Sequence, residues 1–282
     1  MAREHTESRK PQAAPRDARP GEAKSHRTPT AQIAAPGDEP LTVPGALVID
    51  GPFRFDRGLA KRLRMREVNA KEAFTIRDGA GGWFRASLKE YDGKGGVAVP
   101  YERMSRSPEA TIDLTLACAI LARQRMHWVV QKATELGVRR IVPLLTDHSV
   151  PPDGIEQEQA HAWAGHVARA ARQCRRSSLP HLLAPATLDA FLASPLLASA
   201  DLRLYLDDRS DSAGAPAPAK PPRQIVLLVG PEGGFSDAER HRLAGSARPW
   251  ALGGRVLRAE TAALVGLTAV HVTWGDFTDA AE

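Results

Sequence analysis

The residues best suited to chemistry form a glycine-rich string that follows an apolar segment. GPEGGFS occupies residues 230–236 and comes directly after the apolar residues 225–229. Ser236 and Glu239 have the spacing of a capping box, which predicts that a helix begins there. A buried strand that turns through glycines into a helix leaves backbone N–H groups and a crevice at its carboxyl end, where α/β sheets bind ligands. We therefore expect a ligand site at this string.

Two alternative interpretations apply to the same string. A plain turn with a helix cap needs the same residues and no ligand, but the acid Glu232 inside the turn favours a polar ligand or a neighbouring N–H. The string is not a P-loop, because no Lys-Ser/Thr follows its last glycine, and it does not match the G-x-G-x-x-G dinucleotide fingerprint. A nucleotide-dependent kinase or dehydrogenase is thereby disfavoured.

A second string, LGGRVLRAETA at residues 252–262, repeats the order of strand, glycine turn and helix. Arg255 and Arg258 lie in its turn. Guanidinium groups offer fixed, forked donors, so this pair indicates binding of an anion or stabilisation of a developing negative charge. The alternative for Arg255 is an ion pair with Glu260 that supports the loop.

A basic run lies between residues 54 and 66 and contains one acid, Asp56. Its cations repel one another unless a polyanion offsets them, so we predict a phosphate-contacting patch, with a solvated basic face as the alternative. The predicted patch consists of Arg54, Arg57, Lys61, Arg62, Arg64 and Arg66.

Alternating strands and helices position the two glycine strings. Strand-like runs lie at residues 111–118, 140–145, 202–206, 224–229 and 250–252. Between and after them, apolar stripes with helical spacing lie at residues 126–136, 156–176 and in a last helix that ends near Trp274. The alternation predicts a parallel sheet covered by helices on both faces.

The part of the chain before residue 108 has a different hydrophobic pattern. Short β-like runs lie at residues 46–49, 73–77, 83–88 and 96–99, and glycine-containing turns separate them. They predict a small β-rich domain over residues 41–107, followed by the α/β domain over residues 108–282. Residues 1–40 carry almost no large apolar side chain, so we expect a disordered tail, with a basic RNA-contacting arm as the alternative. An alanine- and proline-rich loop interrupts the α/β domain at residues 209–222.

Composition bounds the protein class. With 282 residues and 43% hydrophobic content, the chain is long and apolar enough to form hydrophobic cores. The classes of wholly disordered and collagen-like proteins are therefore excluded. Its apolar segments fall short of the roughly 20 residues of a membrane-spanning helix. The net charge of +5 is compatible with a polyanionic partner. Two cysteines, Cys118 and Cys174, exclude a disulfide framework and suit a reducing compartment, and we expect both to be buried or nearly so.

Three motifs together resemble the RsmE family of ribosomal RNA methyltransferases: GPEGGFS, LGGRVLRAETA and VQKATELGV at residues 130–138. They occur in the family's order, and the resemblance covers residues 41–277. It implies a PUA-like β-barrel domain that binds RNA, followed by an α/β SPOUT domain with a deep trefoil knot. The sequence departs from the family at Gly254, where a proline is common, and at Ala259, where a threonine is common.

The resemblance implies an S-adenosylmethionine-dependent enzyme that methylates N3 of a uridine in 16S ribosomal RNA of the small ribosomal subunit. It further implies a cytoplasmic homodimer with no metal and no membrane attachment. The implied cofactor-binding residues are Leu228, Val229, Gly230, Glu232, Gly234, Leu252, Gly253, Val256 and Leu257.

Catalytic roles follow from the chemistry of uridine, whose neutral N3 is a poor nucleophile. We expect Arg258 to stabilise the deprotonated ring and Arg255 to orient the base or a phosphate, while Glu232 accepts the proton or holds its loop. Arg172, Arg175 and Arg176 add further cations for RNA.

Two rival functions remain at this level. An RNA-binding assembly factor with a decayed cofactor pocket would show the same domains and charge. A related methyltransferase would act on transfer RNA or large-subunit RNA.

Overall fold

The structure is a computed structural model that describes residue 35, residues 37–209 and residues 218–277. The predicted tail is therefore outside the described residues except at its end, as is most of the predicted loop at 209–222. Within the described residues, no helix is both long and apolar enough to cross a membrane.

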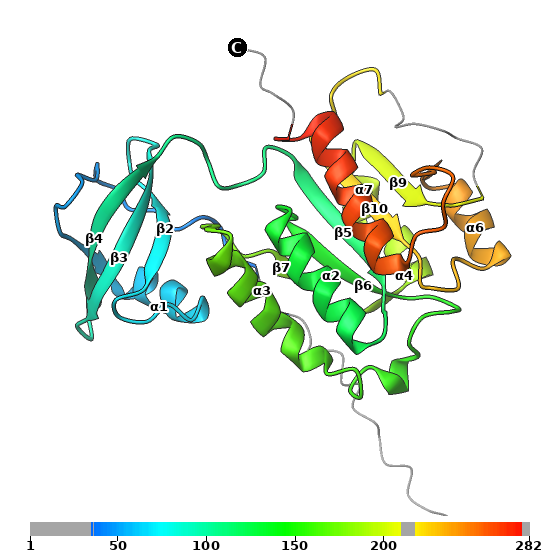
Figure 1. Cartoon of the computed structure of the whole chain (residues 1–282), viewed down its shortest axis with the longest axis horizontal. Coiled ribbons are helices and arrows are strands. Elements are labelled where there is room, and N and C mark those ends of the chain that lie inside the picture. Colours follow the sequence, from blue (N-terminus) through cyan, green and yellow to red (C-terminus); the bar gives the residue numbers. More distant parts are fainter. Residues whose placement is uncertain (1–34, 36, 210–217, 278–282) are drawn as a thin grey trace, which may run out of the picture.

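The N-terminal domain is built on a four-stranded antiparallel sheet with one helix packed against it (Figure 1). Its elements are β1 (Phe53–Asp56), α1 (Arg57–Met65), β2 (Ala73–Arg77), β3 (Trp83–Tyr91) and β4 (Gly95–Met104). The strand order is β1-β4-β3-β2, so among the described residues the sheet is open rather than a closed barrel. Residues 46–49 form no strand, which corrects the prediction there; Val48 is 70% exposed.

The turn between β2 and β3 follows from its sequence. Asp78 and Gly82 form the end of the β2–β3 hairpin, where the Asp78 carboxylate accepts hydrogen bonds from Ala80 N and Gly82 N. Gly81 takes φ +87°, a conformation that side chains disfavour. The predicted turn between these strands is confirmed.

The C-terminal domain holds the predicted parallel sheet. Its strands are β5 (Asp113–Ala119), β6 (Arg140–Leu145), β7 (His181–Leu182), β8 (Ala186–Thr187), β9 (Leu202–Leu206), β10 (Gln224–Val229) and β11 (Arg248–Trp250). The order is β11-β9-β10-β5-β6-β7, with β8 also paired to β6, and every pair is parallel. The last strand begins and ends two residues earlier than predicted.

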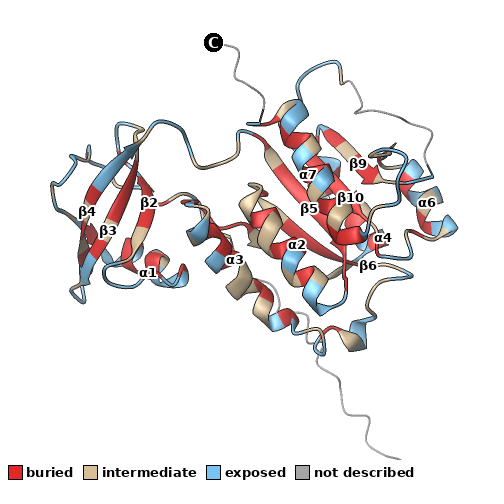
Figure 2. Ribbon diagram, viewed as in Figure 1, coloured by how far each residue is buried: buried red, intermediate tan, exposed pale blue. Residues whose placement is uncertain are grey.

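Helices cover both faces of this sheet, as predicted (Figure 1). One face carries α2 (Arg123–Glu135), α3 (Trp163–Gln173) and α7 (Ala259–Trp274), and the other carries α4 (Leu188–Leu192), α5 (Pro195–Ala198) and α6 (Asp237–Ala244). Figure 2 shows the central strands buried over most of their length, because both faces are covered. The predicted helix over 156–176 is shorter in the structure: short 3-10 turns at Pro152–Gly154 and Ala160–Ala162 precede α3.

Both cysteines are free thiols in or near the core, as predicted: Cys118 is buried and Cys174 is partly buried. Burial, together with the neighbouring carboxylates Glu232 and Glu260, raises the pKa of Cys118 to about 12. This thiol is therefore a packing residue and not a nucleophile.

The two domains are joined by buried polar groups around residues 175–178. Thr75 donates a hydrogen bond of 2.7 Å to the Arg175 carbonyl oxygen, and Ser177 Oγ donates one of 3.0 Å to the Thr75 carbonyl oxygen. Glu109 accepts hydrogen bonds from the N–H groups of Ser177 and Ser178. We call residues 66, 75, 109 and 176–178 the domain latch.

The chain already lies against the C-terminal domain before residue 41. Ala35 and Asp38 exchange backbone hydrogen bonds with Leu182 and Leu179. The boundary predicted at residue 40 thus falls inside a segment that is paired in the structure.

Candidate functional site

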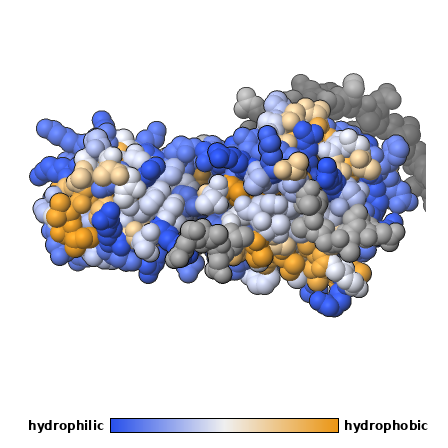
Figure 3. All heavy atoms as spheres, turned by 90° about the horizontal axis from the view of Figure 1, so that it is seen from above, coloured by the Kyte–Doolittle hydropathy of each residue, from blue (hydrophilic) through white to orange (hydrophobic). Residues whose placement is uncertain are grey.

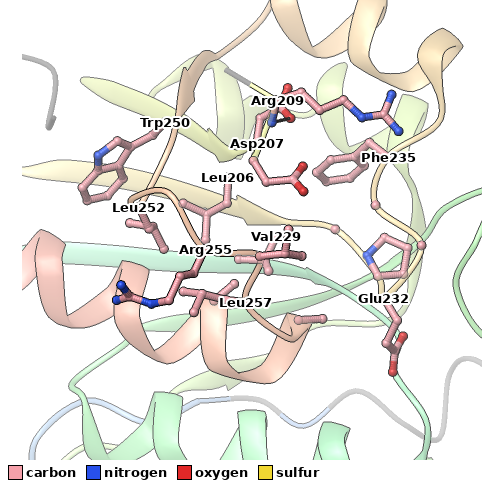
Figure 4. A pocket seen from close by; sticks show the side chains of 18 of the residues that line it. Leu206, Asp207, Arg209, Val229, Glu232, Phe235, Trp250, Leu252, Arg255 and Leu257 are labelled. Atoms are coloured by element: carbon pink, nitrogen blue, oxygen red, sulfur yellow. Dashed lines mark hydrogen bonds between the residues drawn. The ribbon is translucent and has the colours of Figure 1, made fainter. Parts of the chain in front are cut away.

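A pocket opens at the carboxyl ends of β9 and β10, between the two glycine-containing loops (Figure 4). The first loop, residues 230–236, connects β10 to α6, and the second, residues 251–258, connects β11 to α7. The pocket is lined by Leu206, Asp207, Asp208, Arg209, residues 229–235, Arg240, Trp250, Leu252, Gly253, residues 255–257, Ala259 and Ala262. The two strings predicted to bind a ligand therefore meet at one site.

The first loop has the capping box predicted for it. Ser236 Oγ accepts from Glu239 N at 3.2 Å, and Glu239 accepts from Ser236 N at 2.9 Å, which starts α6. Gly234 takes φ +70°, and its N–H donates to the Pro231 carbonyl oxygen. A Cβ added at Gly230 would stand 3.2 Å from the Phe235 ring, so the backbone runs close to its neighbours here.

A loop after β6 braces the first loop from outside, which the sequence did not predict. Asp147 N donates to Glu239 at 3.0 Å, and Ser236 Oγ donates to the Asp147 carboxylate. The His148 ring nitrogen Nδ1 lies 3.0 Å from the Gly234 carbonyl oxygen. The glycine turn is thus braced by Asp147 and His148 of the loop that follows β6.

The second loop presents both predicted arginines to solvent. Arg255 lines the pocket, on the opposite side from Glu232 in Figure 4, whereas Arg258 does not line it and forms the N-cap of α7. Neither side chain makes a hydrogen bond or an ion pair with the described residues. The alternative in which Arg255 pairs with Glu260 is therefore not observed. Both arginines are exposed, and their side chains are unpaired within the described structure.

Nearly all residues predicted to bind the cofactor line the pocket; Leu228 does not. Successive side chains of a strand point to opposite faces, so Val229 faces the pocket side while Leu228 packs in the core on the other face of the sheet. The Leu228 side chain therefore lies outside the pocket, and a contact of Leu228 with the cofactor stays a prediction.

Glu232 has a partner that was not anticipated. Its Oε1 accepts a hydrogen bond from Nη1 of Arg125, in the first turn of α2. Arg125 Nε also lies 3.8 Å from Glu260 Oε1, at the start of α7. Figure 4 shows the Glu232 carboxylate pointing away from the apolar side chains of the pocket.

Sequence reasoning also missed the polar end of β9. Asp207 is nearly buried and pairs with Arg240 of α6, and Asp207 N donates to the Trp250 carbonyl oxygen at 3.2 Å. A signal was present, because Asp207 and Asp208 come directly after the predicted strand 202–206 at its carboxyl end.

The cations predicted to contact RNA, in the basic patch and at residues 172–176, divide into two groups. Arg66 and Arg176 are 4% and 7% exposed and belong to the domain latch, where Arg66 pairs with Asp38 and Arg176 pairs with Glu109. Burial lowers the pKa of Arg66, although Asp38 opposes this. Because buried, paired guanidinium groups cannot reach phosphates, we correct both assignments.

The remaining cations keep some exposure. Arg62 is largely occupied by Asp38 and the Pro40 carbonyl oxygen, and Arg172 donates to the Glu67 carbonyl oxygen. Arg64 lies over the Tyr91 ring, 4.5 Å from its centroid. Arg54 pairs with Asp92 and Arg175 lies 3.6 Å from Glu102, both at the surface. Arg57 and Lys61 are exposed and make no ion pair with the described residues.

Comparison with known proteins shows to which family the chain belongs. Residues 108–271 match the RNA methyltransferase domain family. The ribosomal RNA small subunit methyltransferase E of Synechocystis is 33% identical over 212 residues, covering 74% of this chain and 68% of that protein. The chain belongs to the RsmE family.

Solved structures of RsmE-like proteins agree with this assignment. The structure of ribosomal RNA small subunit methyltransferase E from Neisseria gonorrhoeae, bound to S-adenosyl methionine, is 26% identical with a TM-score of 0.61 and covers 85% of this chain and 99% of that chain. The methyltransferase Lpg2936 from Legionella pneumophila, in complex with the cofactor SAM, is 28% identical with a TM-score of 0.60, covering 84% and 98%. Every pocket residue falls inside the segment that matches the family.

Proposed function

We propose that this RsmE protein transfers the methyl group of S-adenosylmethionine to N3 of a uridine in 16S ribosomal RNA of the small ribosomal subunit. The observation that carries the proposal is the pocket between two glycine-containing loops at the carboxyl end of a parallel sheet. The similar proteins are named as methyltransferases of small-subunit ribosomal RNA, and the one from Neisseria gonorrhoeae is bound to S-adenosyl methionine, which supports the RNA and the donor in this proposal.

The pocket fits the donor chemically. Leu206, Val229, Leu252 and Leu257 supply apolar walls for an adenine ring, and the loop backbones supply N–H and C=O groups for its edges and the ribose. Glycines permit this close approach because they carry no side chain, and Gly230, Gly233, Gly234 and Gly253 all line the pocket. When bound, the sulfonium supplies an electrophilic methyl group.

The arginines control the charge of the accepting base. Uridine N3 attacks only after its proton leaves, and a guanidinium beside the ring lowers the energy of the resulting anion. Arg258 has this role in the proposal, and Arg255 orients the base or a phosphate, since both are exposed beside the pocket and unpaired within the described structure. Glu232 accepts the proton or holds its loop.

In this proposal, exposed cations of the N-terminal domain and Arg175 bind RNA phosphates around the target uridine. Arg57, Lys61 and Arg64 lie on α1, whose last turn is basic, and Arg54 and Arg175 extend the positive surface. Unpaired or looped RNA presents its bases most readily, which suits a base that must leave its stack to be methylated.

The finer features of the fold belong to the same proposal. Backbone hydrogen bonds of residues 41–43 with Arg77 add a short paired segment beside β2, which supports a PUA-like domain. From β11 at the sheet edge, the chain returns through residues 251–258 to α7, which packs on α2 and β10. This return supports the trefoil knot.

A homodimer in the cytoplasm, without metal, completes the proposal. Trp128 of α2 and Val265 and Val272 of α7 expose apolar surface on neighbouring helices. Figure 3 shows apolar atoms gathered along an edge of the C-terminal domain. A second copy would cover such a patch.

The deciding experiment is methylation of small ribosomal subunits that lack this modification. The purified protein with S-adenosylmethionine is expected to modify one uridine at N3, which blocks its pairing edge and halts reverse transcription there. Absence of the modification, or its appearance in transfer RNA or large-subunit RNA, would overturn the substrate assignment. Calorimetric titration with S-adenosylmethionine separates the enzyme from a decayed RNA-binding module, which would give no heat.

A further inference from the structure

We propose that Arg125 is a positioning residue, which holds the first glycine loop against the start of α7 through Glu232 and Glu260. Glu232 then acts on the donor through the shape of its loop and is not the proton acceptor. This inference rests on the proposed function and assigns a role to a helix that does not line the pocket.

One guanidinium connects three elements. Arg125 is the third residue of α2; Glu232 lies in the loop after β10, and Glu260 lies in the first turn of α7. The Nη1 and Nε groups point to different carboxylates, one hydrogen-bonded and one 3.8 Å away. Only the forked geometry of arginine serves both partners at once, because a lysine ammonium has no second arm.

The Glu260 carboxylate depends on this arrangement. Its side chain is 10% exposed, and Oε2 is buried with no hydrogen-bond partner in the described structure. A buried carboxylate that lacks full hydrogen bonding is costly unless a cation lies nearby. Within the described residues Arg125 is the cation that pairs with it, so removing Arg125 leaves a buried charge at the very point where the second pocket loop meets α7.

Glu232 is placed for holding rather than for proton transfer. A proton acceptor must reach the proton that it removes, but Figure 4 shows the Glu232 carboxylate pointing away from the apolar side chains of the pocket, and this carboxylate accepts a hydrogen bond from Arg125. Glu232 and its two neighbours in the chain, Pro231 and Gly233, line the pocket, so a displacement of Glu232 also displaces the pocket wall. The carboxylates also raise the pKa of Arg125, which agrees with a guanidinium engaged by both.

The ion pair contributes little to the stability of the fold. Arg125 and Glu232 side chains are 41% and 37% exposed, and ion pairs with such exposure are screened by water and salt. Breaking the pair by Glu232→Gln is therefore expected to affect ligand binding rather than folding, whereas Arg125→Ala also leaves the buried Glu260 without its cation. This difference makes the role testable.

The experiment compares Arg125→Ala, Arg125→Lys, Glu232→Gln and the double variant Arg125→Ala/Glu232→Gln in the full chain. We expect Arg125→Ala and Glu232→Gln each to weaken S-adenosylmethionine binding by about tenfold in calorimetry. The double variant should bind the donor no more weakly than Arg125→Ala, because Arg125→Ala already removes the connection to Glu232. Arg125→Lys should fall between wild type and Arg125→Ala.

Arg242→Ala is the matched control. Arg242 has the same side-chain exposure, 40%, and its own ion pair with Asp189 at 2.9 Å, but it does not line the pocket. We expect no change in donor affinity. The melting temperature of every variant is measured; if Arg125→Ala does not fold, the exposed Glu232→Gln carries the same test.

The kinetics distinguish positioning from proton transfer. With saturating donor, Glu232→Gln should keep kcat within about threefold and retain the wild-type pH profile, because positioning alters donor binding first. A large loss of kcat with a changed pH profile and normal donor affinity would make Glu232 the proton acceptor and overturn the proposal. Unchanged donor affinity in Arg125→Ala would also overturn it. If the wild-type protein itself binds no donor, the proposed function fails instead.

Discussion

Arg66, at the end of α1, donates a hydrogen bond of 2.9 Å to the carbonyl oxygen of Ser177, beyond α3. A residue that the sequence grouped with the RNA-contacting cations is thus a bond between the two domains. It also donates to the Glu39 carbonyl oxygen and pairs with Asp38. One buried guanidinium therefore connects α1, the segment before residue 41 and the C-terminal domain.

Replacing Arg66 by alanine is expected to lower the free energy of unfolding by about 3 kcal/mol, because the change removes the hydrogen bonds from Arg66 to the carbonyl oxygens of Arg62, Glu39 and Ser177 and leaves Asp38 paired with Arg62 alone. Urea denaturation at neutral pH measures it. Arg57→Ala, on the exposed side of the same helix, should change the free energy by no more than about 0.5 kcal/mol. Equal stability of the two variants would contradict the latch.

Glu109 should make the latch sensitive to acid. Burial alone would raise the pKa of Glu109. Arg176 and the hydrogen bonds from Ser178 and Ser177 lower this pKa by more than burial raises it, so the pKa in the folded protein lies below the ordinary one. Its stabilisation is therefore present above the ordinary pKa of about 4.3 and is lost as the pH falls through the folded value. The stability advantage of wild type over Glu109→Gln should be largest near neutral pH and shrink in acid. Urea unfolding across this range measures it, and a constant difference would refute the prediction.

Arg258→Ala is expected to lower kcat for ribosomal substrate by about 100-fold while leaving the affinity for S-adenosylmethionine unchanged, because the guanidinium acts on the uridine anion and does not line the donor pocket. Single-turnover methylation measures the chemical step. Arg248→Ala, which removes another exposed arginine outside the pocket lining, is the control. A change of only a few-fold in Arg258→Ala would remove this residue from the mechanism.

Reversing the charge of Arg57, Lys61 or Arg64 should weaken RNA binding and reduce the salt dependence of the binding constant by about one phosphate contact each. Filter binding over a series of salt concentrations gives the slope. Lys220→Glu reverses an exposed lysine in the C-terminal domain and should leave the slope unchanged. If all four variants keep the wild-type slope, α1 does not contact the phosphates.

Local patterns predicted the parts of the site that depend on neighbours in sequence. The apolar run before Gly230 predicted β10, and the spacing of Ser236 and Glu239 predicted the start of α6. Both signals lie within a few residues, where backbone hydrogen bonding and strand burial are decided.

Contacts between distant residues could not be predicted in this way. Arg125 and Glu232 are separated by 107 residues, and Arg66 and Ser177 by 111. In sequence, Arg66 resembles its exposed neighbour Arg64; only the packing of α1 against residues 176–178 distinguishes them. The burial of a charged group is set by tertiary packing, which a run of like charges does not reveal.

The domain latch has a consequence for how a long polyanion would meet this molecule. Since buried hydrogen bonds oppose swivelling between the two domains, the span from α1 to the mouth of the pocket has one preferred length. An RNA strand bound at α1 would then reach the pocket at a fixed distance, so the proposal predicts that the enzyme selects a nucleotide by its distance from α1 as well as by its chemistry.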